Sequence, residues 1–423
     1  MSRVAIVGTG YVGLTTGAVL AHLGHSVVCA DVVADKVEAL RRGEVAILED
    51  GLEDLVREGI GGGRLSFVVG SAAAVRGAEF VFMCVQTPQS DDGAADLTYI
   101  ENAAREIAAE LSPGSVVINK STVPVGSTRL VEQALGRADV AVVSNPEFLR
   151  EGSAVYDSLH PDRIVVGADD QAAAVRVSEL FDGVQAPLIV TDPASAEMIK
   201  YASNSFLATK VSYVNAIANL CEVVGADVRE VALGMGYDKR IGFEVLRPGP
   251  GFGGSCLPKD TRALVRMAED AGYDFGLLQG VVDVNDEQFD RMVDKVKRML
   301  GGELAGRTVA AWGLTFKART NDLRESPALE IIRRLRASGA AVRAYDPTVT
   351  GELEGVTVVG DAYAACEGAE VLVVLTEWDE FRWLDFDKVR AALAQPRVVD
   401  CRNLLDPAAL RRRGFTYEGL GRS

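Results

Sequence analysis

The segment RVAIVGTGYVG, residues 3–13, decides the fold of the N-terminal half of the chain. Its apolar run, Val4 to Val7, predicts a strand that leads into the glycine pattern G-x-G-x-x-G. An apolar helix is expected over residues 14–23, followed by a second strand over residues 26–30. A strand, a glycine turn and a helix in this order form the phosphate-binding unit of a doubly wound, dinucleotide-binding sheet.

The glycines and the acid after the second strand indicate which dinucleotide is bound. Gly8 and Gly10 permit the turn and the close approach of a pyrophosphate, and Gly13 lets the helix pack tightly on the strand. The pyrophosphate would then sit at the helix N-terminus, where backbone N–H groups lack partners. Asp31 ends the second strand, where it would bind the ribose hydroxyls and repel a 2′-phosphate. NAD is therefore favoured over NADP.

Three further strands are expected, over residues 80–85, 116–119 and 140–144, and each ends in a polar loop. The loops carry Thr87, Thr122 and Glu147. In an open α/β sheet, ligands bind beyond the carboxyl ends of the strands, so these loops are candidates for cofactor and substrate contacts. Ordinary turn chemistry explains the same residue types.

The C-terminal part repeats the pattern of the first. GAAVRAYD at residues 339–346 matches GHSVVCAD at residues 24–31, down to the final aspartate. A second Rossmann-like sheet is therefore expected, although it lacks G-x-G-x-x-G. Its first loop, FKART at residues 316–320, is basic, which suits either an anionic ligand or a solvated surface.

A long helix is expected between the two sheets, from about Pro193 to Val224. Lys200 and Asn204 are four residues apart and share one face of it. The predicted fold is α/β, with two Rossmann-like, doubly wound parallel sheets joined by a helical connector domain that also offers a dimer surface. The expected domains are residues 1–192, 193–300 and 301–423.

Cys256 lies in GFGGSCLPKD, residues 251–260. Pro258 is typical of an early helix position, which would place the thiol near a helix N-terminus and favour its thiolate. Lys259 and Arg262 add positive charge nearby. A buried structural cysteine is the alternative interpretation.

Composition narrows the class of protein. A chain of 423 residues with 48% apolar and 25% charged residues indicates a soluble globular protein of several domains. The net charge of -16 argues against nucleic acid and anionic membranes as partners. No membrane span or signal peptide is expected, and the scattered cysteines favour a cytoplasmic setting. The three histidines do not cluster, so neither a metal site nor a Ser-His triad is expected.

Over nearly its whole length the sequence closely resembles the UDP-glucose/GDP-mannose dehydrogenase family. The resemblance rests on motifs in the family's order: VAIVGTGYVG at the start, TPQSDDGAADL (87–97), STVPVGS (121–127), NPEFLREG (145–152), MIKYASNSFLATKVSYVNAIA (198–218), GPGFGGSCLPKD (249–260) and GLTFKARTNDLRESPAL (313–329). Small departures occur, since Ala46 and Asp50 replace prolines of the family pattern and Gln86 replaces a small residue.

The resemblance implies a four-electron oxidation of the C6 alcohol of a nucleotide sugar to a carboxylate, using two NAD. Cys256 would form a thiohemiacetal and then a thioester with the sugar, while Lys200 and Asn204 stabilise the oxygen that gains charge. Asp260, with Thr122, would hold or deprotonate the hydrolytic water, and Glu147 is the other candidate base. The choice between these two bases stays open.

The family motifs place ligand contacts on this chain. The cofactor contacts are Gly8, Gly10, Tyr11, Val12, Gly13, Asp31, Lys36, Thr87, Thr122 and Arg324. The substrate contacts are Glu147, Phe148, Leu149, Lys200, Asn204, Arg240, Phe252, Gly253, Lys317 and Arg402. In the family, the equivalent of Arg240 crosses the interface of a homodimer.

The sugar is the open point of this interpretation. UDP-glucose is the first choice, and GDP-mannose and UDP-N-acetylhexosamines are alternatives. A hydroxyacid dehydrogenase would share one Rossmann unit and a catalytic lysine, but it would need neither Cys256 nor a second basic sheet. An inactive nucleotide-sugar sensor is disfavoured by the intact set of Lys200, Asn204, Cys256 and Asp260.

Overall fold

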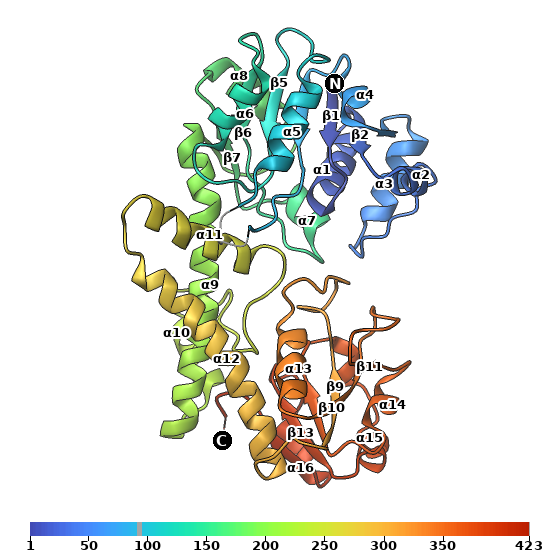
Figure 1. Cartoon of the computed structure of the whole chain (residues 1–423), viewed down its shortest axis with the longest axis vertical. Coiled ribbons are helices and arrows are strands. Elements are labelled where there is room, and N and C mark those ends of the chain that lie inside the picture. The colour runs from blue at the N-terminus through green and yellow to red at the C-terminus, as the bar shows by residue number, and fades with distance from the viewer. Residues whose placement is uncertain (91–94, 423) are drawn as a thin grey trace. The chain divides into compact units, whose positions relative to one another are not determined.

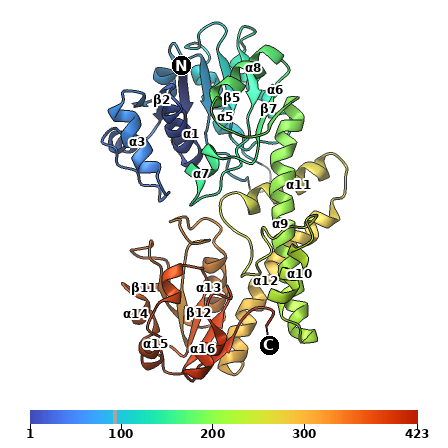
Figure 2. The ribbon, with the colours of Figure 1, turned by 180° about the vertical axis from the view of Figure 1, so that it is seen from behind.

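A computed structural model of the chain describes residues 1–90 and 95–422. The chain divides into two compact units, Met1–Ser203 and Asn204–Ser423 (Figures 1 and 2). The division falls inside helix α9 (Pro193–Val224), which has the bounds expected from the sequence. The predicted motif at residues 87–97 includes residues 91–94, which lie outside the described residues.

The first unit is built on an eight-stranded sheet with the order β3-β2-β1-β4-β5-β6-β7-β8. Strands β1 to β6 run parallel in the 3-2-1-4-5-6 order of a dinucleotide-binding fold, which confirms the predicted class. The pair β7 and β8 extends the sheet antiparallel to β6, and the sequence did not predict it. The strands are β1 (Arg3–Val7), β2 (Ser26–Asp31), β3 (Leu65–Val69), β4 (Phe80–Met83), β5 (Val116–Asn119), β6 (Ala141–Ser144), β7 (Ile164–Gly167) and β8 (Leu188–Thr191).

Helices cover both faces of this sheet (Figure 1). Alternate residues of β1 face opposite ways, so Val4 and Ile6 pack with α1, α3 and α8, whereas Ala5 and Val7 pack with α4, α5 and α6. Both faces of the central strands β1, β4 and β5 are buried, which explains their nearly continuous apolar sequences. The helices are α1 (Tyr11–His22), α2 (Ala34–Arg41), α3 (Leu52–Gly61), α4 (Ser71–Val75), α5 (Thr98–Ile107), α6 (Ser127–Leu135), α7 (Ala154–Leu159) and α8 (Gln171–Ser178), with a 3-10 turn at Glu179–Phe181.

The second unit contains a six-stranded, wholly parallel sheet with the order β11-β10-β9-β12-β13-β14. This order repeats that of β1 to β6, as the matched sequence patterns predicted. The strands are β9 (Thr308–Trp312), β10 (Ala341–Tyr345), β11 (Thr357–Val358), β12 (Val371–Val374), β13 (Arg397–Asp400) and β14 (Thr416–Glu418).

One face of the second sheet packs against α12 and α13, and the other against α14, α15 and α16. The buried ammonium of Lys295 on α12 bonds Glu222 of α9 at 2.6 Å and Glu418 of β14 at 3.1 Å, which fastens the sheet to the helices of this unit. The helices are α10 (Val228–Gly236), α11 (Leu257–Asp270), α12 (Gly276–Leu300), α13 (Pro327–Ala337), α14 (Ala362–Cys366), α15 (Phe386–Ala392) and α16 (Pro407–Arg412), with a 3-10 turn at Asp379–Arg382.

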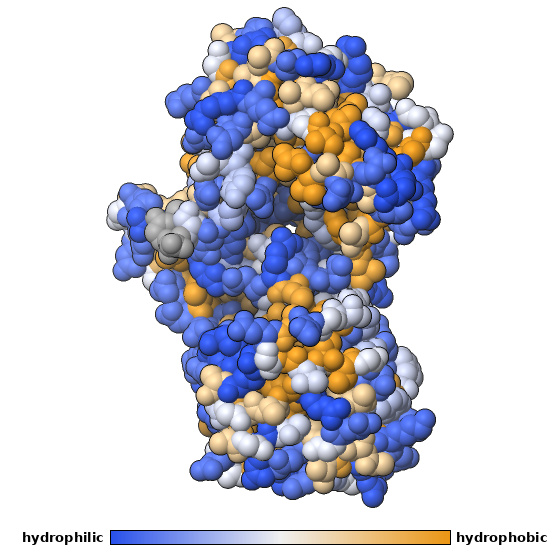
Figure 3. Space-filling view, turned by 45° about the vertical axis from the view of Figure 1, so that its right-hand side comes forward, coloured by the Kyte–Doolittle hydropathy of each residue, from blue (hydrophilic) through white to orange (hydrophobic). Residues whose placement is uncertain are grey.

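Hydrophilic side chains cover much of the visible surface, with apolar side chains gathered in smaller areas (Figure 3). Within the described part of the chain, no helix is long and apolar enough to cross a membrane.

Candidate active site

The predicted site residues up to Lys200 lie in the first unit, and those from Asn204 onward lie in the second. In the first unit, the turn at residues 8–13, called the cofactor turn below, joins β1 to α1. A side-chain carbon at Gly13 would collide with the carbonyl oxygen of Gly8, so only glycine fits there. Gly10 precedes α1 without a side-chain cap, which leaves the first N–H groups of the helix available to a pyrophosphate. The turn therefore fits a dinucleotide.

Asp31 lies at the carboxyl end of β2 and faces this turn. Its carboxylate accepts hydrogen bonds from the Thr9 hydroxyl at 2.5 Å, the Thr9 N–H at 3.2 Å and the Val33 N–H at 3.1 Å. Burial alone would raise its pKa, but these bonds and the ammonium of Lys36 at 2.9 Å lower the pKa to about 2. Asp31 is thus ionised at neutral pH, as an acceptor for ribose hydroxyls must be.

The loops after β4 and β5 are joined directly. The Thr87 hydroxyl donates to the carbonyl oxygen of Thr122 at 2.9 Å, and the Ser121 hydroxyl donates to that of Val85 at 2.7 Å. The structure therefore brings the two predicted threonines together at the carboxyl edge of the sheet, where ligands bind in this fold.

Glu147 and Lys200 form a buried ion pair in the first unit. Their charged atoms are 2.7 Å apart, and the side chains are 5% and 4% exposed. Burial is the largest influence and raises the pKa of Glu147, but the ammonium of Lys200, the N–H of Leu149 and the charge of Lys120 together lower the pKa overall. The N–H of Leu149 donates to the same carboxylate at 2.7 Å, and the ring of Phe148 lies 5.6 Å from the Lys200 nitrogen. The structure thus brings four predicted substrate residues together.

Two cations near Glu147 were not assigned a role from the sequence. Lys120 is 8% exposed and donates to the side chain of Asn145 at 3.0 Å, and burial lowers its pKa. Arg163 stacks on the ring of Phe148, with its guanidinium carbon 3.7 Å from the ring centre. Lys120 lies two residues before Thr122, so its place in a predicted ligand-binding loop could have identified it from the sequence. Arg163 could not be identified in this way, because it precedes strand β7, which the sequence did not predict.

In the second unit, Cys256 directly precedes α11, and Pro258 lies in the first turn of that helix, as predicted. Cys256 is half-buried, whereas the other five cysteines are buried. The accessible thiol at a helix N-terminus is the arrangement expected of a nucleophile. Among the described residues, no group of three His, Cys, Asp or Glu side chains could hold a metal ion.

Asp260 begins the next turn of α11, and its N–H donates to the carbonyl oxygen of Cys256 at 2.9 Å. Its fully buried carboxylate accepts from the Asn204 amide at 2.6 Å and from the Lys259 ammonium at 2.6 Å. The structure therefore brings three predicted catalytic residues of this unit together, with Asn204 supplied by α9.

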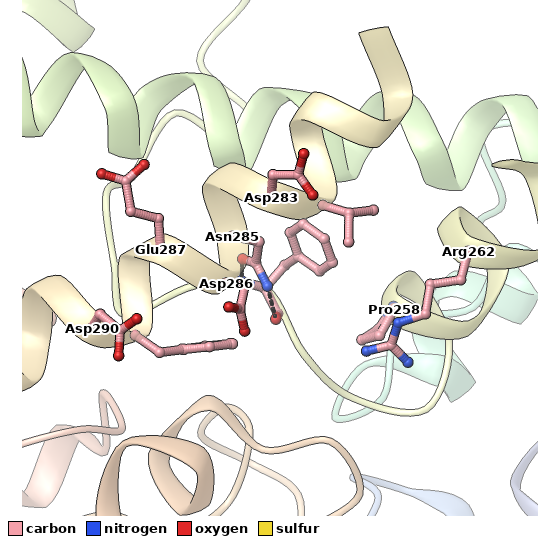
Figure 4. A pocket seen from close by; sticks show the side chains of 10 residues that line it. Pro258, Arg262, Asp283, Asn285, Asp286, Glu287 and Asp290 are labelled. Carbon is pink, nitrogen blue, oxygen red and sulfur yellow. Dashed lines mark hydrogen bonds between the residues drawn. The ribbon is translucent and has the colours of Figure 1, made fainter. Parts of the chain in front are cut away.

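Buried amides hold the loop before Cys256. Asn285 on α12 bonds both backbone groups of Phe252, at 2.7 Å and 3.2 Å (Figure 4). Asn215 accepts from the N–H of Gly249 at 2.8 Å, and Gln288 donates to its carbonyl oxygen at 2.9 Å. The sequence analysis missed these supports, although Asn285 and Gln288 are three apart on an otherwise apolar helix face.

A hollow of about 520 Å³ lies beside this loop (Figure 4). Phe252, Pro258 and Arg262 line one part of it. The rest of the lining includes four carboxylates of α12: Asp283, Asp286, Glu287 and Asp290. One arginine against four carboxylates makes this hollow a poor place for a diphosphate.

The basic loop predicted from the sequence lies against the cysteine loop, since a side-chain carbon at Gly254 would lie 2.8 Å from the ring of Phe316. A side-chain carbon at Gly253 would collide with the carbonyl oxygen of Glu325 and the ring of Pro327. Lys317 lies 5.4 Å from the ring of Phe316. Arg402 donates to the carbonyl oxygen of Phe316 at 3.0 Å, so it braces this loop. The structure therefore brings together the loops that carry Gly253, Lys317 and Arg402, whereas Arg240 is not shown to contact them.

Two predicted arginines have salt-bridge partners in their own loops. Arg324 pairs with Asp322 at 2.6 Å and its side chain is 64% exposed. Arg240 pairs with Asp238 at 2.5 Å and its side chain is 88% exposed. Exposed pairs of this kind contribute little stability, so replacing Asp322 or Asp238 by an anionic ligand would cost little.

Comparisons with known proteins agree with these observations. Three domains of the UDP-glucose/GDP-mannose dehydrogenase family match the chain: the NAD binding domain at residues 2–185, the central domain at 194–287 and the UDP binding domain at 310–407. A UDP-glucose 6-dehydrogenase of Bacillus subtilis, TuaD, is 45% identical over 100% of this chain and 94% of its own length.

Solved structures match over the same length. A UDP-glucose dehydrogenase from Pyrobaculum islandicum has a TM-score of 0.90 at 38% identity and covers 100% of this chain and 98% of its own. A UDP-D-ManNAc dehydrogenase from Pyrococcus horikoshii also has a TM-score of 0.90, at 28% identity, and covers 99% of both chains. The fold alone therefore does not distinguish between these sugars.

Proposed function

The chain belongs to the UDP-glucose/GDP-mannose dehydrogenase family, and on that basis we propose that it oxidises UDP-glucose to UDP-glucuronate. The observation that carries this proposal is the half-buried Cys256, one helical turn before the Asp260 carboxylate that Asn204 binds. Of the matched relatives, the UDP-glucose enzyme from Bacillus has higher identity to the chain than the UDP-D-ManNAc enzyme, 45% against 28%. The cofactor turn and Asp31 would hold NAD, which would supply the hydride acceptor for both oxidations.

The residues of the chain supply the rest of the chemistry. The thiolate of Cys256 adds to the C6 aldehyde and gives a thiohemiacetal, which loses its hydride to leave a thioester. Lys200 and Asn204 donate to the C6 oxygen as negative charge develops on it. Hydrolysis of the thioester releases the carboxylate and restores the thiol. A covalent link keeps the aldehyde from escaping between the two oxidations.

Either Asp260 or Glu147 prepares the hydrolytic water. Asp260 is bound by Asn204 and Lys259, and Glu147 is bound by Lys200, so each carboxylate is held ready as an acceptor. Asp260→Asn and Glu147→Gln distinguish them. The variant that lacks the base gives one rapid burst of NADH followed by slow turnover, because its thioester accumulates. The other variant turns over without such a burst.

The substrate is tested by NADH formation at saturating NAD with UDP-glucose, GDP-mannose, UDP-N-acetylglucosamine and UDP-N-acetylmannosamine. We expect the highest kcat/KM with UDP-glucose, and a higher value with UDP-N-acetylmannosamine would reassign the sugar. Cys256→Ser should lose at least about a thousandfold in turnover while still binding NAD. Cys366→Ser is the matched control, because burial raises the pKa of Cys366 to about 12 and leaves it inert. Full turnover by Cys256→Ser would exclude the thioester.

We also propose the three-domain division at residues 1–192, 193–300 and 301–423, a cytoplasmic location and a homodimer. Phe206, Tyr213 and Leu220 recur at intervals of seven residues on α9 and are 65%, 53% and 54% exposed, which supports a helix-to-helix interface with a second copy. In that dimer, Arg240 of one protomer would reach its partner's substrate. Light scattering should show a dimer for the native chain and a monomer for Tyr213→Asp, and a native monomer would contradict this proposal.

A further inference from the structure

Glu49 is a buried carboxylate in the first unit that the reaction does not use. It is 7% exposed and lies just before α3, whose first N–H, that of Leu52, donates to its carbonyl oxygen at 3.2 Å. One carboxylate oxygen accepts from the Tyr11 hydroxyl and from the N–H of Gly152 at 2.7 Å. The other accepts from the N–H of Ala154 at 2.7 Å. Its position is therefore fixed by donors from two other segments.

The donors come from two segments to which different ligands are assigned, the cofactor and the nucleotide sugar. Tyr11 is the first residue of α1 and lies inside the cofactor turn. Gly152 ends the loop at residues 145–152, called the substrate loop below, and Ala154 begins α7. The N–H of Gly152 also donates to the Tyr11 hydroxyl at 2.8 Å. Glu49, Tyr11 and Gly152 thus form a closed triangle of hydrogen bonds.

The substrate loop is braced internally, so a restraint at Gly152 reaches Glu147. Both the N–H and the guanidinium of Arg150 bond the carboxylate of Asp157 on α7, at 2.9 Å and 2.6 Å. The N–H of Leu149 bonds Glu147 itself at 2.7 Å. Leaving a buried donor of this network without its acceptor costs about 1–3 kcal/mol, so the segments shift together rather than separately.

We propose that Glu49 is a positioning residue that couples the cofactor turn to the substrate loop, so that bound NAD orders the loop that receives the nucleotide sugar. Bound NAD restrains the turn and with it Tyr11. A restrained Tyr11 hydroxyl holds the Glu49 carboxylate, which in turn holds the N–H groups of Gly152 and Ala154. The role in substrate binding rests on the proposed function, whereas the coupling itself requires only NAD.

The test is amide hydrogen exchange at Gly152 and Ala154, resolved to single residues, with and without saturating NAD. In the native chain, we expect NAD to slow exchange at both amides by about fivefold or more, the lower end of usual coupling between sites. In Glu49→Gln, the side-chain NH2 group would face N–H donors that now bind a carboxylate. NAD should therefore change the exchange rates of the Gly152 and Ala154 amides less than about twofold in this variant. Tyr11→Phe removes only the hydroxyl and should give the same loss without burying an unpaired amide.

Glu106→Gln is the matched control in the same unit, because Glu106 accepts from the N–H of Ser71 at the start of α4 and touches neither loop. It should keep the protection of the native chain. Equal protection in the native chain, Glu49→Gln and Tyr11→Phe would overturn the proposal, and so would a native chain in which NAD protects neither amide. NADH formation with UDP-glucose is measured separately, so a wrong sugar would leave the exchange result intact.

Discussion

The six strands of the second sheet repeat the order of β1 to β6 in the first, and each sheet has an aspartate at the end of its second strand. The two aspartates differ in burial and in hydrogen-bond partners. Asp31 is the last residue of β2 in the first sheet, and Asp346 directly follows the equivalent strand β10 in the second sheet. The side chain of Asp31 is 11% exposed and lies beside Thr9 and Lys36. Asp346 is 2% exposed, and its carboxylate accepts from backbone and side-chain donors of the second sheet: Leu314, Thr315, Thr348 and Trp378.

The difference lies in how completely donors of the protein surround each acid. In the first sheet, glycines keep the turn tight and leave the acid facing the place of a ribose. In both sheets the acid accepts from the first loop, Asp31 from Thr9 and Asp346 from the N–H groups of Leu314 and Thr315 at 2.8 Å and 3.2 Å. Asp346 also accepts from Thr348 and from the indole of Trp378, and it is almost fully buried. Asp346 therefore has no free acceptor for a ribose, and an anionic ligand there must be held by other groups such as Lys317. A shared pattern predicts the fold but not the ligand.

The largest effect is expected from Asp346→Asn, which tests whether Asp346 has a structural role. The amide end of asparagine would face donors that now have an acceptor, so we expect the second unit to lose about 2–4 kcal/mol of unfolding free energy. All three tryptophans, Trp312, Trp378 and Trp383, lie in this unit, so their fluorescence during urea unfolding reports it specifically.

Asp361→Asn is the control for that experiment, because Asp361 only caps α14 from an exposed position and should cost about 1 kcal/mol. NAD affinity should stay within about twofold for both variants, since neither touches the first unit. A weakened NAD affinity in Asp346→Asn without loss of stability would contradict a purely structural role for Asp346.

The complementary change is Asp31→Ala, which should weaken NAD rather than the fold. Loss of charged hydrogen bonds to the ribose corresponds to about 1.5–3 kcal/mol, so we expect the Kd for NAD to rise about 10- to 100-fold by calorimetry. Discrimination against NADP should fall as well, because the charge that repels the 2′-phosphate is gone. Asp35→Ala, at an exposed acid on α2, should leave the Kd unchanged. An unchanged Kd in Asp31→Ala would remove Asp31 from the ribose site.

The smallest effect concerns pH. The pKa of Asp31 is lowered from 3.8 to about 2, so the unfolded chain takes up this proton first as the pH falls. The stabilisation from Asp31 is therefore present above about pH 4 and is lost as the pH falls towards 2. We expect the Kd for NAD to vary less than about twofold between about pH 7.5 and pH 5. A rise of about tenfold over that range, absent in Asp31→Asn, would show that Asp31 titrates there instead.

Much of this organisation is predictable from the sequence, because it depends on local patterns. The glycine turn, Asp31 and the bounds of α9 follow from periodicity and from residues that tolerate few alternatives. The repeat at residues 339–346 predicts the second sheet for the same reason. These features need no knowledge of distant contacts.

The remainder depends on partners far apart in the chain. Strands β7 and β8 do carry short apolar runs, IVVG and LIVT, which the sequence analysis did not recognise as strands. The antiparallel pairing of β7 with β6 depends on tertiary contacts and not on such a run. Asp346 accepts a hydrogen bond from Trp378, which lies 32 residues further along the chain. The proposed role of Glu49 likewise depends on hydrogen bonds with Tyr11 and Gly152, which are distant in the sequence. Such contacts are fixed by tertiary packing, which a sequence pattern does not encode.

The four-electron oxidation is tested most directly by the ratio of NADH formed to UDP-glucose consumed, measured at 340 nm with limiting sugar and excess NAD. We expect two NADH for each UDP-glucose, with UDP-glucuronate as the product and no free aldehyde, because Cys256 retains the intermediate. A ratio of one with release of the aldehyde, or no NADH at all, would contradict the four-electron oxidation proposed for this chain.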